Sequence, residues 1–241
     1  MTTPRKLAIA CCLLVSFLSF ASTNTVPVSP AEASTAKLIA ITHGLLIDGS
    51  GHAPIKNSVV IVRDGLIEAV GSFGRIQIPA GAQVVDARGL VLAPGFIDTH
   101  SHADRGLESD PDAKTQVSQG ITTIAVGQDG GSNFPVGDFL KRLDREPTAL
   151  NVLTFVGHAT VRAKVMGEDT GRTATESEIN QMKSLVEQAM QDGAFGLSSG
   201  LEYEIGKPAT TDEVISLAQV AGQYGGIYIS HIRDEAECLA R

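Results

Sequence analysis

Two different hydrophobic patterns follow one another along the chain. From Lys37 to Leu92, short runs of β-branched and other apolar residues alternate with turn pairs such as Asp48-Gly49 and Asp64-Gly65. An Asp-Gly pair between two apolar runs is typical of a hairpin turn. The pattern therefore predicts a small all-β module over residues 37–93. Its expected strands are residues 38–41, 45–47, 59–62, 66–70, 84–85 and 90–92.

After Pro94 the pattern changes to an apolar strand, a polar loop and a helix in turn. Two Thr-x-x-Glu capping boxes, at residues 175–178 and 210–213, each precede apolar residues at helical spacing. Gly193 and the Gly-Gly pair at 225–226 mark the ends of these two helices. The expected strands of this part are residues 95–98, 122–127, 152–157, 194–199 and 227–230.

Strands that alternate with helices predict a parallel sheet with right-handed crossovers, in an α/β fold. An open α/β sheet and a β/α barrel both satisfy this pattern. A closed barrel needs eight βα units, whereas the pattern supplies five of them before Arg241. We therefore expect either an open sheet or part of a barrel.

The first residues have the pattern of a secretory signal. Arg5 and Lys6 precede an apolar run over residues 7–20, which is about 14 residues long, and a bilayer-spanning helix needs roughly 20. This predicts a signal peptide over residues 1–21 and an exported, periplasmic or secreted protein, and it favours no stable membrane insertion after cleavage; a retained anchor is the alternative. Residues 22–36, rich in Ser, Thr, Ala and Pro, are expected to be a flexible leader.

The composition and charge of the chain indicate which kinds of molecule it binds. The chain has 241 residues, of which 43% are apolar, and this is enough for a substantial core. Its formal net charge is -8 and no Lys/Arg cluster follows the signal, so nucleic acid is not an expected partner and a small-molecule substrate is. Cleavage of the signal leaves Cys238 as the one cysteine, which excludes an internal disulfide. The oligomeric state stays open.

Residues that can bind metal recur at the predicted strand ends. Reacting groups collect at the carboxyl edge of a parallel β/α architecture. The first strand runs into His100-Ser-His102, and this spacing in extended chain lets both imidazoles point the same way toward a metal. The other four strand ends carry Asp129, His158, Glu202-Tyr203-Glu204 and His231-Ile-Arg233-Asp-Glu235. This recurrence predicts a metal site.

Each residue also has a simpler interpretation. Two exposed loop histidines satisfy a lone His-x-His, and Asp129 before two glycines is typical of a turn. His158 is also compatible with a cap on its strand, and Glu202 with a solvated loop carboxylate. Arg233 is equally suited to a structural ion pair with the acidic residues next to it. The recurrence at five strand ends is what favours the metal site over these alternatives.

The segment Pro94-Gly-Phe-Ile-Asp-Thr-His-Ser-His102 is similar to the opening signature of the amidohydrolase superfamily. Its members are metal-dependent hydrolases on a β/α barrel flanked by a small β-sandwich, which the 37–93 module resembles. The resemblance implies a partial TIM-like barrel of about five βα units over residues 94–241. The motifs that resemble the N-acyl-D-amino-acid deacylase (D-aminoacylase) branch are residues 119–123, 156–162, 196–200 and 229–235.

The resemblance implies a centre of one or two Zn²⁺ ions, with other divalent metals as alternatives. It makes His100 and His102 ligands of one metal and His231 a ligand of a second, tighter-held one. Asp129 occupies the position of a bridging cysteine in the branch. Glu202 lies near the place from which other branches bridge their metals with a carboxylated lysine. Both remain candidates for the bridge.

The resemblance also implies the substrate contacts. Tyr203 matches a family tyrosine that contacts the substrate carboxylate, Arg233 is a second anion contact, and His158 is a third candidate for substrate binding. A metal-binding His and the general-base Asp are expected beyond Arg241, so no catalytic residue is assigned within the chain. The implied reaction is attack of a metal-activated hydroxide on an amide carbonyl, with that Asp carrying the proton to the leaving amine.

The expected function is hydrolysis of the amide bond of N-acyl-D-amino acids, as the N-terminal part of a longer enzyme. The acyl group and the amino-acid side chain stay open. A cyclic-amide hydrolase, similar to a dihydroorotase or a hydantoinase, is an alternative within the superfamily. A catalytically inert truncated fragment is the alternative from another class, because half a barrel leaves unpaired strand edges.

Overall fold

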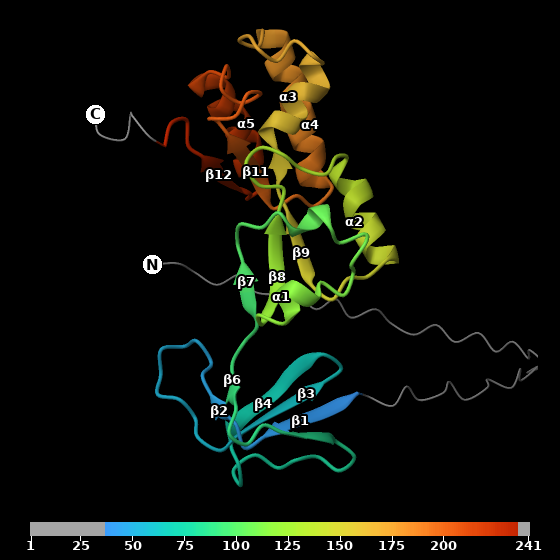
Figure 1. The fold of residues 1–241 in the computed structure, drawn as a ribbon, viewed down its shortest axis with the longest axis vertical. Coiled ribbons are helices and arrows are strands. Elements are labelled where there is room, and N and C mark those ends of the chain that lie inside the picture. The colour runs from blue at the N-terminus through green and yellow to red at the C-terminus, as the bar shows by residue number, and fades with distance from the viewer. Residues whose placement is uncertain (1–36, 236–241) are drawn as a thin grey trace, which may run out of the picture. The chain divides into compact units, whose positions relative to one another are not determined.

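The computed structural model describes residues 37–235 (Figure 1). The predicted signal over residues 1–21, the predicted leader over 22–36 and Cys238 lie outside the described residues. The described chain divides into two compact units. The first comprises the residues up to Leu45 and Ile55–Leu90, and the second comprises Leu46–Pro54 and the residues from Val91 onward.

The first unit contains a four-stranded sheet with the order β4-β3-β1-β5. The pairs β1/β3 and β3/β4 are antiparallel, and β5 runs parallel to β1. The predicted turn Asp64-Gly65 forms the two-residue hairpin between β3 and β4, and both residues have positive φ, as a type I′ turn requires. The strands are β1 (Leu38–Thr42), β3 (Ser58–Arg63), β4 (Leu66–Ser72) and β5 (Gln83–Asp86).

The sheet is held by a small apolar cluster at its centre. Ala40, Val59 and Ile61 are buried there, and the partly buried Ile76 and Ile78 pack against them. A separate two-stranded sheet joins β2 (Leu45–Leu46) and β6 (Val91–Leu92). The predicted strands before residue 94 are therefore all present, within one or two residues at their ends.

The second unit contains two parallel three-stranded sheets. The first has the order β7-β8-β9 and the second β10-β11-β12, so neighbours in space are neighbours in sequence. The predicted strand over residues 152–157 is divided at Phe155, because β9 pairs with β8 whereas β10 pairs with β11. The strands are β7 (Phe96–Asp98), β8 (Ile121–Val126), β9 (Asn151–Thr154), β10 (Val156–Gly157), β11 (Gly196–Gly200) and β12 (Ile227–His231).

The helices follow the strands along the chain. The helices α4 and α5 were predicted, whereas the sequence offered no start signal for α2 and α3, whose N-caps Pro135 and Gly157 provide no side-chain acceptor. The helices are η1 (Ala103–Arg105), α1 (Lys114–Val117), α2 (Val136–Arg145), α3 (His158–Met166), α4 (Glu176–Gln191) and α5 (Thr211–Gln223). None of the helices within residues 37–235 has the length and apolar character to cross a bilayer.

The two predicted capping boxes form to different extents. Thr175 accepts from the backbone N–H of Glu178, and the Glu178 carboxylate accepts from the backbone N–H of Thr175, so the first box is complete. Thr210 accepts from the backbone N–H of Glu213, but the Glu213 carboxylate turns to other partners. The second box is therefore only half formed.

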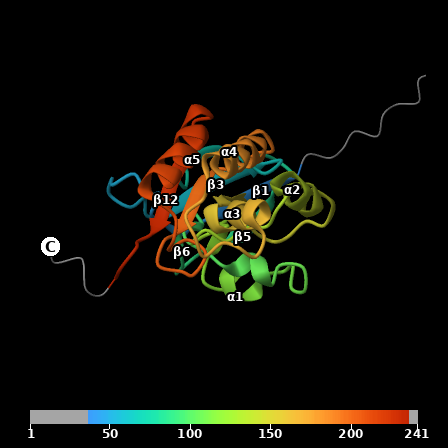
Figure 2. The same cartoon turned by 90° about the horizontal axis from the view of Figure 1, so that it is seen from above.

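The helices α3, α4 and α5 lie side by side in the second unit (Figure 2). Met182 and Val186 of α4 and Leu217 of α5 are fully buried, and they share one apolar cluster with Val156 of β10 and Leu197 of β11. The predicted apolar faces of α4 and α5 are thus the faces that cover the strands. This packing fixes the positions of the β10 and β11 carboxyl ends.

The start of α4 carries an ion-pair network with a testable pH dependence. The Arg172 guanidinium hydrogen-bonds Glu178 and Asp169, and together with the Thr175 amide it holds the pKa of Glu178 at about 2, below its usual 4.5. A carboxyl group whose pKa falls on folding stabilises the fold above its unfolded pKa, and this contribution is lost as the pH falls through the folded pKa.

Arg172→Met is therefore expected to lower the Tm at pH 7, with a difference from the unaltered chain that narrows from about pH 4.5 toward pH 2. Thermal unfolding followed by circular dichroism across this range is the measurement. Arg145→Met, at an exposed arginine of α2, is the matched control and should show no such trend. An equal Tm difference at pH 7 and pH 2.5 would contradict this account of Glu178.

Candidate metal centre

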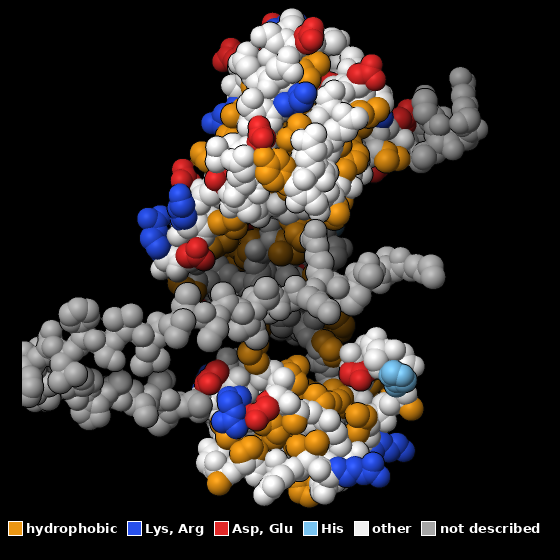
Figure 3. Space-filling model, turned by 180° about the vertical axis from the view of Figure 1, so that it is seen from behind, with side chains coloured by type: hydrophobic (Ala, Val, Ile, Leu, Met, Phe, Trp, Pro, Cys, Tyr) orange, Lys and Arg blue, Asp and Glu red, His pale blue; other side chains and the backbone are white. Residues whose placement is uncertain are grey.

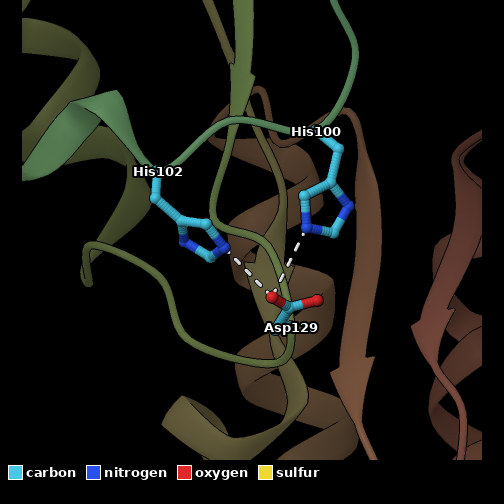
Figure 4. Close-up of side chains that lie close together, drawn as sticks. All are labelled: His100, His102 and Asp129. Atoms are coloured by element: carbon cyan, nitrogen blue, oxygen red, sulfur yellow. Dashed lines mark hydrogen bonds and ion pairs between the residues drawn. The ribbon is translucent and has the colours of Figure 1, made fainter. Parts of the chain in front are cut away.

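Histidines and a carboxylate converge at the carboxyl ends of the strands. His100 and His102 follow β7, and Asp129 follows β8. The Nε2 atom of His102 lies 3.0 Å from Oδ2 of Asp129, and Nε2 of His100 lies 3.4 Å from the same oxygen. Figure 4 shows both imidazoles turned toward this one carboxylate. The two histidines thus present ring nitrogens to a common point, as a metal ion requires of its ligands.

The second oxygen of Asp129 faces His231, at the end of β12. The distance between Oδ1 of Asp129 and Nδ1 of His231 is 3.9 Å. This oxygen is buried and accepts no hydrogen bond from any described residue. Leaving a charged buried acceptor unpaired is costly. A cation among these side chains would remove that cost, so the donor set fits a divalent metal.

A second group of possible ligands surrounds His231. Its Nε2 atom lies 3.1 Å from Oε2 of Glu202 and 3.2 Å from Oε1 of Glu235. One ligand atom from each of these three residues lies within 4.8 Å of the others, and the same is true of His100, His102 and Asp129. The sequence analysis did not assign Glu235 as a ligand, although it placed this residue at the same strand end as His231.

The loop that carries Asp129 is held by backbone contacts. Asp129 has φ of 56°, between glycines that also have positive φ. The buried hydroxyl of Ser198, on β11, donates to the carbonyl of Gly127 at 2.5 Å and accepts from the N–H of Gly130 at 3.1 Å. Gly200 packs so closely that a Cβ there would overlap the carbonyl of Asp129. Asp129 is therefore both a turn residue and part of the cluster.

Tyr203 joins the cluster through His231, because its hydroxyl lies 3.1 Å from Nδ1 of that imidazole. Partial burial raises the pKa of the Tyr203 phenol, and the negative charges of Asp129, Glu235 and Glu202 raise it further. The phenol therefore keeps its proton at neutral pH and can donate a hydrogen bond in the site.

The two other predicted substrate contacts have different surroundings. Arg233 is exposed, and its Nη1 donates to the backbone carbonyl of Lys207 at 3.1 Å. His158 is fully buried, and its Nε2 lies 2.9 Å from Oε1 of Glu213. A structural role accounts for this position of His158. The contacts of both residues with a substrate stay predictions.

His158 belongs to a buried ionic group that the sequence analysis missed. Nη1 of Arg162 lies 2.5 and 2.6 Å from the two carboxylate oxygens of Glu213, and all three side chains are fully buried. Burial raises the pKa of Glu213, but the hydrogen bonds from His158 and Arg162 outweigh it and hold the pKa below its usual value. The group ties α3 to α5.

The chain matches the model of the amidohydrolase family over residues 83–237. It is 40% identical to the N-acyl-D-aspartate deacylase of Alcaligenes xylosoxydans xylosoxydans, over 89% of this chain and 46% of that protein. It is 38% identical to the D-aminoacylase of the same organism, over 80% of this chain and 44% of that protein. The chain thus spans about half the length of the curated relatives it matches.

Solved structures agree with these sequence matches. The N-acyl-D-glutamate deacylase from Bordetella bronchiseptica, complexed with zinc and a phosphonate inhibitor, is 35% identical, with a TM-score of 0.76 over 82% of this chain and 45% of that one. A D-aminoacylase structure is 33% identical, with a TM-score of 0.74 over the same shares. The described fold is a mixed α/β fold similar to D-aminoacylase. The chain therefore belongs to the amidohydrolase family.

Proposed function

We propose that this chain is the N-terminal part of a metal-dependent enzyme that hydrolyses the amide bond of N-acyl-D-amino acids. The observation that carries the proposal is the Asp129 carboxylate, which faces His100, His102 and His231 and has a buried oxygen without a hydrogen-bond donor. The names of the relatives support the substrate class, since they are deacylases of N-acyl-D-aspartate and N-acyl-D-glutamate and a D-aminoacylase.

The proposed cofactor is one or two Zn²⁺ ions. His100 and His102 would hold one ion, and His231 with Glu202 would hold the other. A relative was solved with zinc, and another is described as having a binuclear metal centre. When bound, such an ion supplies Lewis-acid polarisation of the amide carbonyl and activates a water molecule.

Between the two candidates for the bridge, the contacts favour Asp129. Its Oδ2 faces His100 and His102 while its Oδ1 faces His231, so the carboxylate has one oxygen toward each group. Glu202 contacts His231 and no other histidine among the described residues. Glu202 is therefore proposed as a ligand at one end. A bridging carboxylate would be a harder ligand than a thiolate, and it would make the preference for zinc over other divalent metals less strict.

The chain's own residues would bind and orient the substrate. The Tyr203 phenol stays protonated, so its O–H group can donate a hydrogen bond to the substrate carboxylate. Arg233 would be a second anion contact after it leaves the Lys207 carbonyl. No catalytic residue is assigned among residues 37–235, and the general base is proposed to be an Asp beyond Arg241.

The finer architecture is also a proposal. Strand neighbours in the second unit follow chain order, and this supports part of a β/α barrel over residues 94–241 rather than a doubly wound sheet, whose order reverses.

A β-sandwich is proposed for residues 37–93. Exposed apolar residues on β4 and β5, among them Leu66 and Val84, support a second covering layer there. Figure 3 shows apolar side chains next to one another on that unit. We also propose that residues 1–21 are a signal peptide and that the protein is exported.

The test is turnover by the full-length gene product. It is expected to release amine and carboxylate from N-acyl-D-amino acids and not from the L-isomers, to lose this activity to a chelator, and to regain it with Zn²⁺. Hydrolysis of dihydroorotate or a hydantoin in its place would favour the cyclic-amide alternative. An absence of turnover on every substrate with metal supplied would refute the enzyme and favour an inert fragment.

A further inference from the structure

A cavity of about 320 Å³ adjoins the candidate metal centre, and His102 belongs to its lining. Polar residues from three segments line it: η1 with the residues before it, the loop after β8, and α3. Arg105 is the one cationic side chain in this lining. The volume lies at the lower end of the range for small-molecule pockets, so it admits a short side chain or a short acyl group.

The acidic group of the cavity already has a partner. Asp104 accepts a hydrogen bond from the Asn133 side-chain amide at 2.8 Å. The hydroxyl of Thr160, from α3, accepts from the backbone N–H of Ser132. These bonds join the loop after β8 to both η1 and α3, so the cavity wall is built from mutually bonded groups.

Arg105, by contrast, has no carboxylate within ion-pair distance among residues 37–235. Its contact with the cluster is a long one, 3.4 Å from Nη2 to Nδ1 of His102. That contact requires Nδ1 to be the acceptor. A neutral imidazole that binds metal through Nε2 carries its proton on Nδ1 and has no acceptor left there. A metal held by Nε2 of His102 would therefore leave the Arg105 guanidinium free for another acceptor.

Arg105 and Tyr203 lie at the two ends of a row of contacts. Arg105 contacts His102, His102 contacts Asp129, Asp129 faces His231, and His231 contacts Tyr203. A hydrogen-bond donor that can bind an anion thus lies at each end of the candidate metal centre. A substrate with a single carboxylate, held at Tyr203, leaves the guanidinium at the other end without an anion.

We infer that Arg105 and its cavity bind a second carboxylate of the substrate, beyond the α-carboxylate. This rests on the proposed function, and it narrows the substrate class to N-acyl-D-amino acids with an acidic side chain or an acidic acyl group. A guanidinium is suited to this role because it donates two parallel hydrogen bonds to one carboxylate.

Turnover by the full-length protein distinguishes the two sources of the carboxylate. The substrates are N-acetyl-D-glutamate, N-succinyl-D-leucine and the neutral N-acetyl-D-leucine. Arg105→Met is expected to lower the kcat/KM ratio of the preferred acidic substrate to the neutral one by about tenfold to a hundredfold, the loss typical of a charged hydrogen bond. Arg105→Lys should keep part of the ratio. Arg145→Met, an exposed arginine outside the cavity, should keep all of it.

Binding provides a readout that does not depend on turnover. Glutarate, a dicarboxylate, is expected to bind the zinc-loaded protein more tightly than butyrate by calorimetry, and Arg105→Met should remove this difference. Equal affinities in the unaltered protein, or a difference that survives Arg105→Met, would overturn the inference. If no N-acyl-D-amino acid is hydrolysed, the proposed function fails, and the glutarate measurement still decides whether this cavity binds a second carboxylate.

Discussion

The Asp129→Asn variant is expected to bind Zn²⁺ at least about a hundredfold more weakly than the unaltered protein. Loss of a group that only orients a metal ligand typically costs about 10- to 100-fold in affinity, and a direct ligand should cost no less. Asn is the right replacement because it keeps the shape of Asp and tolerates the φ of 56° at this position, where Ala would add backbone strain. The change therefore keeps the shape of the side chain and removes the charge and one of the two acceptor oxygens.

Competition with a chromophoric chelator measures this affinity, and elemental analysis measures the number of ions bound. Asp144→Asn, at an exposed acidic residue of α2, is the matched control and should bind zinc like the unaltered protein. Asp129→Cys should keep zinc and shift the preference from Mn²⁺ toward Cd²⁺, because a thiolate is the softer ligand. Unchanged zinc affinity in a folded Asp129→Asn protein would rule out Asp129 as a ligand.

The Arg162→Met variant is expected to lose about 3–5 kcal/mol of stability, the usual cost of removing one partner from a buried ion pair. Arg162, Glu213 and His158 are fully buried, so water cannot replace the missing guanidinium. The same guanidinium also donates to the carbonyl groups of Thr170 and Arg172, which become unpaired as well. The substitution should therefore also destabilise the loop before α4, which contains these two carbonyl groups.

Denaturant unfolding at pH 7 measures this loss. Arg145→Met, exposed on α2, should change stability by less than about 0.5 kcal/mol. The double variant Arg162→Met with Glu213→Leu should lose less than Arg162→Met alone, because it leaves no buried carboxylate that has lost its guanidinium partner. A loss below about 1 kcal/mol for Arg162→Met would show that the buried group contributes little.

Much of the local structure follows from the sequence alone. The Asp64-Gly65 turn, the capping box at Thr175 and the apolar faces of α4 and α5 are signals between residues close together in the chain. The same holds for the succession of strands along the chain and for the placement of His100 and His102 after the first strand of the β/α part. Local backbone preference and hydrophobic period determine such features, and both can be read from a short window.

The tertiary structure decided which of these side chains meet. His102 and Asp129 are 27 residues apart in the chain, and His158 and Glu213 are 55 apart. The capping-box pattern predicted that the Glu213 carboxylate would accept from the backbone N–H of Thr210 at the start of α5. The carboxylate instead pairs with the buried Arg162.

The division of the 152–157 segment at Phe155 and the cavity at Arg105 likewise depend on which strands and loops pack together. Sequence period determines which face of an element is apolar. Only the packing of distant elements determines which polar groups lose water together and must satisfy one another.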